Sequence, residues 1–176
     1  VREALARCEI VVVQEAFATT ATCGFADLLL PATTWGEKEG TVTNSERRIS
    51  RVQAAIPPLG EARHDWAILA AFGRELEARL PAHTARYLPG TVTLFPYETA
   101  ESVWLEHRAT TAGRDLDITG LSYQILEEVG PQQWPMPAHA PQGQARLYTD
   151  GRFATPSGRA RFAAAAALIC GIHRDR

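Results

Sequence analysis

The sequence predicts a mixed α/β fold: part of a doubly wound, mostly parallel, Rossmann-like sheet, followed by an irregular α+β extension. Two short apolar runs, Ile10–Val13 and Leu28–Pro31, are continuous enough to form strands that are buried on both faces. Apolar residues then recur at helical spacing between Trp66 and Leu80. Beyond Leu80, prolines and glycines interrupt each apolar stretch, which favours shorter and less regular elements.

The regular part of the fold is expected in the first half of the chain. Up to residue 30 we predict the end of a helix over 2–8, a buried strand over 9–15, a crossover helix over 19–25 capped by Thr19 or Thr20, and a second strand over 26–30. After it we predict two strands over 41–44 and 48–52 joined by a turn, and a helix over 65–80 with Trp66, Leu69, Phe72, Leu76 and Leu80 facing inward. The order strand, crossover, strand predicts parallel pairing.

The second half is predicted to be less regular, and we divide the chain into segments 1–80 and 81–176. The elements expected there are a strand over 91–95, a helix from its cap Thr99 to His107 that buries Val103 and Trp104, a helix capped by Thr119 with Tyr123, Leu126 and Val129 inward and Gly130 at its end, and extended pieces over 146–153 and 158–162 with turns at Gly151 and Gly158. We expect this segment to pack on the rest of a larger protein.

The bulk composition excludes several classes of protein. The 176 residues carry 18 basic and 20 acidic side chains, and the net charge of -2 provides no basic field for nucleic acid. No apolar run is long enough to cross a bilayer, and no signal peptide is visible. Cys8, Cys23 and Cys170 form no Cys-x-x-Cys pair, which argues against a disulfide scaffold, a zinc site or an iron–sulfur cluster in this chain and favours three structural thiols in a reducing compartment, here the cytoplasm. Both ends of the chain suggest a segment of a longer protein.

Four residues are candidates for binding a ligand. Gln14 and Glu15 stand at the carboxyl end of the first predicted strand, where open α/β sheets bind ligands and where a carboxylate commonly accepts hydrogen bonds from ribose. Lys38 follows the second strand in a loop, from which it can reach phosphate or carbonyl oxygens. Asp65 can either cap its helix or accept both N–H donors of a guanine edge. The alternative for each residue is an ordinary solvated or capping role.

Other side chains give weaker signals. Arg47, Arg48 and Arg51 form a basic cluster that is either a solvated face or a group that attracts an anion. The five histidines share no metal-ligand spacing, and no Gly-x-Gly-x-x-Gly or P-loop pattern occurs, so a nucleotide would have to be held by side chains. We therefore predict no catalytic residue and no metal ligand within this chain.

Several stretches match a known sequence pattern. They are Val11-Val-Val-Gln-Glu-Ala-Phe-Ala-Thr19, Ala26-Asp-Leu-Leu-Leu-Pro-Ala-Thr-Thr-Trp-Gly-Glu-Lys-Glu-Gly-Thr-Val-Thr-Asn-Ser-Glu-Arg-Arg48, Leu59-Gly-Glu-Ala-Arg-His-Asp65, and later pieces over 113–123, 130–135 and 147–162. In these stretches the chain resembles the molybdopterin oxidoreductase family. Within that family it is most similar to the catalytic subunits of bacterial assimilatory nitrate reductases.

The resemblance implies a cofactor, an activity and a set of contacts. The cofactor would be bis-molybdopterin guanine dinucleotide with molybdenum, accompanied by a [4Fe–4S] cluster bound outside this segment. Gln14, Glu15, Lys38 and Asp65 match cofactor-binding positions of the family, so residues 1–80 would bind one dinucleotide arm. The implied reaction is reduction of nitrate to nitrite. A formate dehydrogenase-like enzyme of the same family and a non-catalytic α/β structural module are the alternatives.

The resemblance also implies what the chain lacks. The family's cysteine motif for the cluster, the cysteine that ligates molybdenum and the β-rich carboxyl-terminal domain do not occur in it. We therefore expect the segment to be inactive alone. Its expected partners are the remaining domains of the same enzyme, an electron-donor protein or domain and a small anionic substrate, with no nucleic acid and no membrane.

Overall fold

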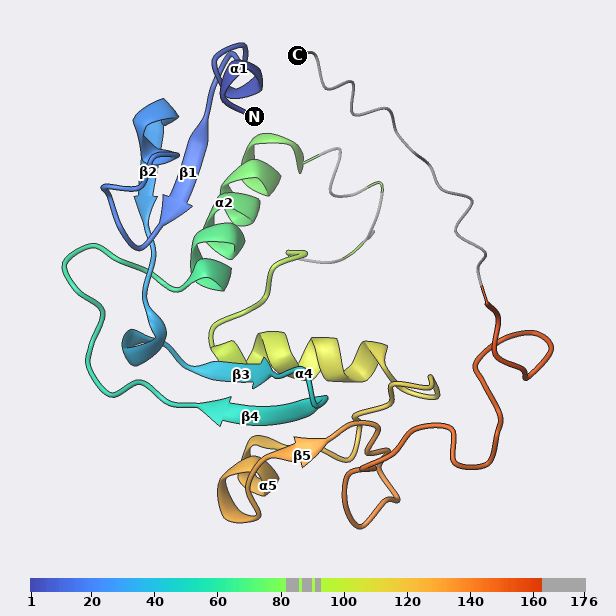
Figure 1. The fold of residues 1–176 in the computed structure, drawn as a ribbon. Coiled ribbons are helices and arrows are strands. Elements are labelled where there is room, and N and C mark those ends of the chain that lie inside the picture. Colours follow the sequence, from blue (N-terminus) through green and yellow to red (C-terminus); the bar gives the residue numbers. More distant parts are fainter. Residues whose placement is uncertain (82–85, 87–89, 91–92, 163–176) are drawn as a thin grey trace. The chain divides into compact units, whose positions relative to one another are not determined.

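The computed structural model describes residues 1–81, 86, 90 and 93–162. Close contacts group residues 1–143 into one compact unit and residues 144–176 into a second. The helices and strands described in the first unit are α1 (Arg2–Leu5), β1 (Val12–Glu15), β2 (Leu28–Pro31), β3 (Gly40–Thr43), β4 (Arg48–Val52), α2 (Asp65–Arg79), α4 (Ala100–Thr110), α5 (Tyr123–Glu128) and β5 (Gln132–Gln133), with 3-10 turns η1 (Cys23–Phe25) and η2 (Trp35–Glu37) (Figure 1).

The first two strands form a parallel pair. Val12 lies opposite Leu28, and Glu15 lies opposite Pro31. The predicted parallel pairing and the end of the first strand at Glu15 are therefore confirmed, and the fold is mixed α/β. Because the described residues contain two parallel strands and a separate antiparallel sheet, the doubly wound arrangement is not confirmed.

The connection between β1 and β2 differs from the prediction. In place of a crossover helix from Thr19, the chain forms turns that end in the 3-10 turn η1, and neither Thr19 nor Thr20 caps it. Three threonines and a glycine oppose helix formation in this short segment, which cannot nucleate a stable helix. The expected burial of both strand faces is also wrong, since Val12 and Leu28 are about half exposed.

The antiparallel sheet has the order β3–β4–β5. Asn44 closes the β3–β4 turn, because its Oδ1 accepts hydrogen bonds from the backbone N–H groups of Glu46 and Arg48, both at 3.0 Å. The predicted strand–turn–strand is thus confirmed. The short strand β5 was not predicted, and it pairs Gln132 with Ile49 of β4.

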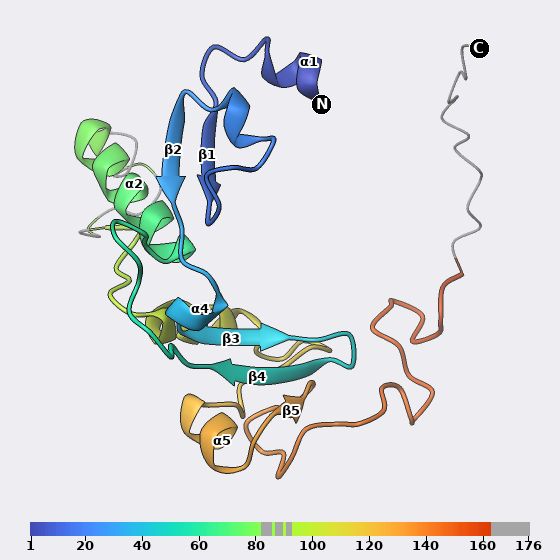
Figure 2. The ribbon, with the colours of Figure 1, turned by 60° about the vertical axis from the view of Figure 1, so that its left-hand side comes forward.

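The hydrophobic core lies where this sheet meets α4 and α5 (Figure 2). Leu121 is fully buried, and the rings of Trp104 and Tyr123 pack with centroids 5.3 Å apart. The core cluster comprises Ile49, Trp104, Ile118, Leu121, Tyr123, Leu126 and Met136. Most of these residues follow Leu80, so the compact unit continues across the proposed boundary at residue 80. Separate roles for residues 1–80 and 81–176 stay a prediction.

Helix α2 confirms the predicted helix but buries a different face. Its buried residues are Ala70 and Gly73, and a Cβ atom on Gly73 would lie 2.6 Å from the ring of Phe95. Among the side chains predicted to face inward, four are exposed: Leu69, Phe72, Leu76 and Leu80. The small residues permit close contact with Phe95, and the large apolar side chains consequently face the opposite way.

The helix caps of the second half are partly as predicted. Thr99 caps α4, since its Oγ1 accepts a backbone N–H of the first turn at 3.1 Å. Ser122, not Thr119, caps α5 in the same manner. The hydroxyl and N–H of Thr119 instead donate to a neighbouring carboxylate. Val129 was wrongly predicted to face inward and is exposed just after the helix, whereas Gly130 ends it as predicted, with φ 94°.

Of the remaining predicted elements, the turns are found and the strand is not. Residues 93–95 form no strand, and residues 91–92 of the predicted strand lie outside the described residues. In the second unit, residues 144–162 contain bends and turns without strand pairing. The predicted turns occur at Gly151 and Gly158, with φ values of 70° and 65°.

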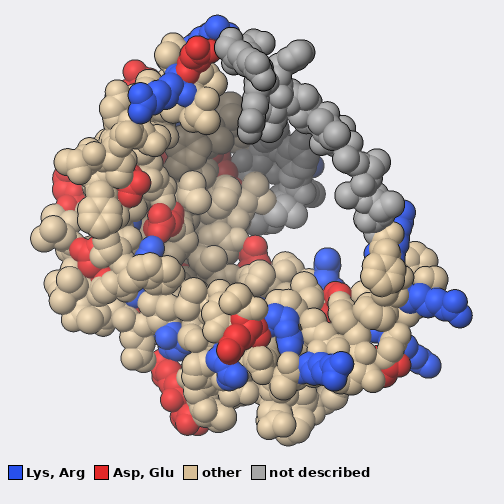
Figure 3. Space-filling view, viewed as in Figure 1, with Lys and Arg blue, Asp and Glu red and all other residues tan. Residues whose placement is uncertain are grey.

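The described surface carries mixed charge. Figure 3 shows basic and acidic side chains interspersed on one face, in keeping with the net charge of -2. Among the described residues, no helix combines the length and apolar character that a bilayer crossing requires.

The core around Leu121 leads to a stability prediction. Replacing Leu121 with Ala should lower the free energy of unfolding by about 3 kcal/mol, because a fully buried side chain leaves a cavity. Val129→Ala, at the exposed position that follows α5, should change the free energy of unfolding by less than ~0.5 kcal/mol. Urea unfolding followed by tryptophan fluorescence measures both. Equal effects of the two substitutions would contradict the assigned core.

Candidate functional site

Three of the four predicted ligand-binding residues meet in one cluster. The Nε2 of Gln14 donates a hydrogen bond to Oδ1 of Asp65 at 2.6 Å. The Nζ of Lys38 lies 3.2 Å from Oδ2 of the same carboxylate. We call Gln14, Lys38 and Asp65 the Lys38 cluster. Its members come from the end of β1, the loop after β2 and the first turn of α2, so the fold joins positions far apart in the sequence.

Pairing between the end of β2 and the start of α2 brings the cluster together. Ala32 and Arg63 form a parallel bridge, in which Arg63 N donates to Pro31 O and Thr33 N donates to Arg63 O. The Oγ1 of Thr33 also lies 3.0 Å from Nδ1 of His64, the residue that precedes α2. These bonds fix the start of α2 beside the chain that leaves β2, and Asp65 therefore lies next to the Lys38 loop.

The structure tests the capping role predicted for Asp65. The residue is the first of α2 and follows the N-cap position, which His64 occupies without a side-chain cap hydrogen bond. The capping prediction is therefore wrong, because both carboxylate oxygens face Gln14 and Lys38. Burial raises the pKa of Asp65, but the hydrogen bonds from Gln14 and Lys38 and the lysine charge outweigh burial and hold the pKa below its ordinary value.

Glu15 lies beside the cluster without joining it. Its Oε1 accepts a hydrogen bond from the backbone N–H of Ala16 at 2.8 Å, and the N–H of Phe17 lies 3.4 Å away. Adjacent residues of a strand point to opposite faces, so Gln14 and Glu15 cannot both turn toward Asp65. The structure thus leaves Glu15 at the predicted strand end, on the other side of β1 from its neighbour.

A buried carboxylate holds the loop that carries Lys38. Glu37 is 7% exposed, and its Oε2 accepts hydrogen bonds from the backbone N–H and the hydroxyl of Thr34, at 2.7 and 2.9 Å. Its Oε1 accepts the N–H of Leu59 at 2.9 Å. The hydrogen bonds from Thr34 and Leu59 hold the pKa of Glu37 below its ordinary value. Sequence reasoning missed this residue, although Thr34-Trp-Gly-Glu37 has the spacing of a capping box, with Thr and Glu three residues apart.

Lys38 is chemically distinctive in this chain. It is the only lysine among the 176 residues. Its Nζ lies 5.2 Å from the centroid of the exposed Trp35 ring. An ammonium group near an aromatic face and a carboxylate is held in position while it keeps access to solvent.

The predicted basic cluster is divided by the fold. Arg47 and Arg48 donate to the backbone carbonyls of Trp134 and Pro131, and thereby fasten that segment to the β3–β4 turn. Arg51, further along β4, is largely buried among other partners. The three guanidinium groups therefore do not form one shared site for an anion.

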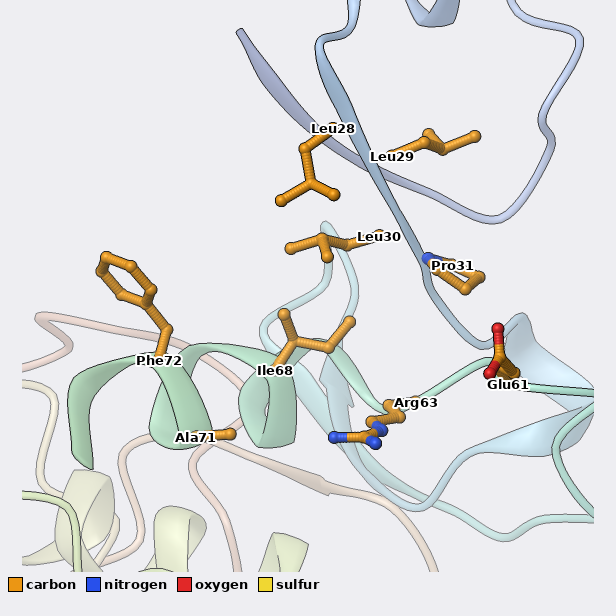
Figure 4. Close-up of a pocket in the computed structure, with 9 residues that line it drawn as sticks. All are labelled: Leu28, Leu29, Leu30, Pro31, Glu61, Arg63, Ile68, Ala71 and Phe72. Atoms are coloured by element: carbon orange, nitrogen blue, oxygen red, sulfur yellow. The ribbon is translucent and has the colours of Figure 1, made fainter. Parts of the chain in front are cut away.

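An apolar groove lies beside the cluster, between β2 and α2 (Figure 4). It has a volume of about 460 Å³. Its lining residues are Leu28, Leu29, Leu30, Pro31, Glu61, Arg63, Ile68, Ala71 and Phe72. Phe72 is 67% exposed along this groove, so the groove is an open apolar surface and not an enclosed polar site.

Metal-binding groups are not assembled in the part of the chain that the structure describes. No set of three histidine, cysteine or acidic side chains lies close enough there to hold a metal ion. Cys8 and Cys23 are free thiols, and Cys170 lies outside the described residues.

Comparisons with known proteins agree on the protein family of this chain. The molybdopterin oxidoreductase family model matches residues 1–75. A nitrate reductase of Synechocystis sp. is 40% identical over 166 residues, which cover 92% of this chain and 21% of that relative. The assimilatory nitrate reductase catalytic subunit of Bacillus subtilis is 34% identical over 160 residues, covering 91% of this chain and 20% of the relative. The chain belongs to the molybdopterin oxidoreductase family.

Two further proteins are similar to this chain, one in sequence and one in fold. Formate dehydrogenase H of Escherichia coli is 32% identical over 166 residues, which cover 92% of this chain and 20% of that enzyme. Among solved structures, acetylene hydratase from Pelobacter acetylenicus shares the fold, with a TM-score of 0.55 and 22% identity over 90% of this chain and 18% of that chain. The chain spans about a fifth of the length of these relatives.

The lowered pKa of Glu37 leads to a prediction about pH. The folded pKa lies below the unfolded one, so the ionised carboxylate stabilises the fold above the unfolded pKa of about 4, and this stabilisation disappears as the pH falls through the folded pKa. Glu37→Gln should therefore lower Tm at pH 7, and the Tm difference from wild type should shrink as the pH falls below about 4.

Thermal melts between neutral and acidic pH measure this difference. Glu46→Gln is the matched control, because that side chain is exposed and pairs only with Arg48 at 3.4 Å in a surface ion pair. We expect a small effect from it at every pH. A Glu37→Gln difference that stays constant down to acidic pH would contradict the role assigned to the carboxylate.

Proposed function

We propose that this chain is the part of a molybdenum-dependent nitrate reductase that binds one arm of bis-molybdopterin guanine dinucleotide. The proposed contacts are Gln14, Glu15, Lys38 and Asp65. The observation that carries the proposal is the Lys38 cluster, in which two hydrogen bonds to one carboxylate join three of these residues. The matching family model covers all four positions.

The chemistry of the cluster fits a guanine nucleotide. A carboxylate offers about four acceptor positions, and the bonds from Gln14 and Lys38 use one on each oxygen of Asp65. The guanine edge presents an N1–H and an N2–H donor, which the remaining positions can accept. Lys38 adds a positive charge suited to a phosphate or a pterin carbonyl oxygen. The side chains of Lys38 and Asp65 are 26% and 52% exposed, so a ligand can reach both.

This segment's part in the reaction would be to bind and orient the cofactor. The bound cofactor supplies the molybdenum chemistry, and the protein supplies binding, orientation and electrostatics. Asp65, with its lowered pKa, stays ionised at neutral pH and keeps its acceptor role. Glu15, on the opposite face of β1, is proposed to contact a different part of the same dinucleotide.

The whole enzyme would contain components outside this chain. We include in the proposal a [4Fe–4S] cluster, an electron-donor protein or domain, and a cytoplasmic location. We also propose that neighbouring domains extend β1 and β2 into a doubly wound sheet. The side chains of Val12, Leu28 and Phe72 are exposed beside the parallel strands, and these domains would cover that apolar surface. The alternative function is that of a non-catalytic structural module. A full-length protein that contains no bound cofactor would favour this alternative.

Cofactor content tests the contacts. Lys38→Ala and Asp65→Asn in the full-length enzyme should each lower the molybdenum and the acid-released GMP per protein about tenfold, because a charge-assisted hydrogen bond contributes about 1.5–3 kcal/mol and 1.4 kcal/mol corresponds to a tenfold change in affinity. Metal analysis and nucleotide chromatography measure the two quantities. Arg79→Gln is the control, since Arg79 pairs with Glu75 on the exposed surface of α2. Unchanged GMP in both site variants would refute the contacts.

The substrate requires a separate test. Formate dehydrogenases are the second candidate because one of them is nearly as similar to this chain as the nitrate reductase of B. subtilis. We predict that the full-length enzyme reduces nitrate with an artificial electron donor and does not oxidise formate. Steady-state assays with each substrate distinguish the two. Activity with formate alone would reject the nitrate reductase assignment and leave the proposed cofactor contacts intact.

A further inference from the structure

Arg51 connects the Lys38 loop to a helix from the second half of the chain. It lies on β4, and its side chain is only 11% exposed. A guanidinium group has five donors in one plane, so it can bind several partners at once. Besides a hydrogen bond to the carbonyl oxygen of the adjacent Val52, the contacts of Arg51 fall into two groups, one on Glu39 and Gly40 directly after Lys38 and the other on α5.

The first group of contacts holds the chain directly after Lys38. The Nη1 of Arg51 donates to the carbonyl oxygen of Gly40 at 3.1 Å. Its Nη2 lies 3.7 Å from Oε2 of Glu39. Glu37 anchors the loop immediately before Lys38 through its bonds to Thr34 and Leu59. Lys38 is therefore held between an anchor on each side.

The second group of contacts ties Arg51 to α5. Its Nε donates to Oε1 of Glu127 at 3.2 Å, and its Cζ lies 3.9 Å from the centroid of the Tyr123 ring. Tyr123 belongs to the hydrophobic core, and its buried hydroxyl has no hydrogen-bond partner among the described residues. Tyr123 thus supports Arg51 through its ring and not through its hydroxyl. The core fixes Tyr123, and Tyr123 and Glu127 fix the guanidinium group.

We propose that Arg51 is a positioning residue that holds the Lys38 ammonium group against Asp65. It acts through Glu39 and Gly40, and α5 sets its position. The biological meaning of this role rests on the proposed function, in which Lys38 contacts the dinucleotide. The geometric claim concerns Lys38 and Asp65 alone and can be tested without cofactor.

The acylation rate of Lys38 reports its position. We would use the full-length protein from a host that cannot make molybdopterin, treat it with acetic anhydride, and quantify acetylation of the Lys38 peptide by mass spectrometry. Arg51→Gln should speed acetylation about threefold, because the lysine would spend less time paired with Asp65. In the Asp65→Asn background, where that pair is already absent, Arg51→Gln should have no further effect.

Two controls separate positioning from general stability. Thr99→Ala removes the cap of α4 and lowers stability without removing a contact of Arg51, and Arg79→Gln removes a guanidinium group elsewhere; neither should change the acetylation rate at Lys38. If Arg51→Gln does not fold, Glu39→Gln at a half-exposed position replaces it and should raise the rate about twofold. An unchanged rate in the variant that folds would overturn the proposal, as would an equal increase in Thr99→Ala.

The same variants distinguish this inference from the proposed function. In the holoenzyme, Arg51→Gln should lower the acid-released GMP about threefold, less than Lys38→Ala does. Full GMP retention in Lys38→Ala would reject the proposed cofactor contact while the acetylation result still stands. Reduced GMP in Lys38→Ala together with an unchanged acetylation rate in Arg51→Gln would reject only the role of Arg51.

Discussion

The carboxylate of Asp65 joins three parts of the chain that the sequence keeps far apart. Gln14 reaches it from the end of β1, and Lys38 reaches it from the loop after β2. Asp65 itself begins α2. These bonds form only if β1 and β2 end together and α2 starts beside them, which the bridge between Ala32 and Arg63 ensures. The proposed binding of the cofactor depends on this convergence.

The surroundings of the cluster explain how a short loop can hold one lysine. The carboxylate of Glu37 accepts three hydrogen bonds from Thr34 and Leu59, which hold the backbone directly before Lys38 in place. Arg51 holds the other end of the loop through Glu39 and Gly40. A buried carboxylate or guanidinium group is favourable only when its hydrogen bonds are satisfied, and both groups meet this condition with several partners.

The distribution of apolar surface fits a chain that covers a fifth of its relatives' length. The core around Leu121 closes on itself, because the sheet β3–β4–β5 and the helices α4 and α5 bury one another's apolar sides. The parallel pair and α2 bury much less, and leave Leu28 and Phe72 open along the groove between them. Apolar surface of this kind ordinarily packs against other protein. The chain therefore buries the core around Leu121 by itself, whereas it leaves apolar side chains of the parallel pair and α2 exposed.

Local sequence patterns determined the elements and most of their ends. The β-branched run produced β1 and its end at Glu15, the apolar spacing produced α2, Asn44 produced the β3–β4 turn, and Thr99 produced the cap of α4. These features depend on a few neighbouring residues, whose backbone preferences and hydrogen bonds act within one or two turns. The same local logic also selected Gln14, Lys38 and Asp65 as candidates.

Only the tertiary structure decided which partners these residues have. The sequence allowed Asp65 to cap its helix, and the fold instead pairs its carboxylate with Gln14 and Lys38. The contact of Gly73 with Phe95 decided which face of α2 is buried. Carbonyl groups more than 80 residues away became the hydrogen-bond partners of Arg47 and Arg48, as in the bond from Arg48 to Pro131. Such contacts depend on the path of the whole chain, because a side chain with several possible partners binds the ones that the fold brings within hydrogen-bond distance.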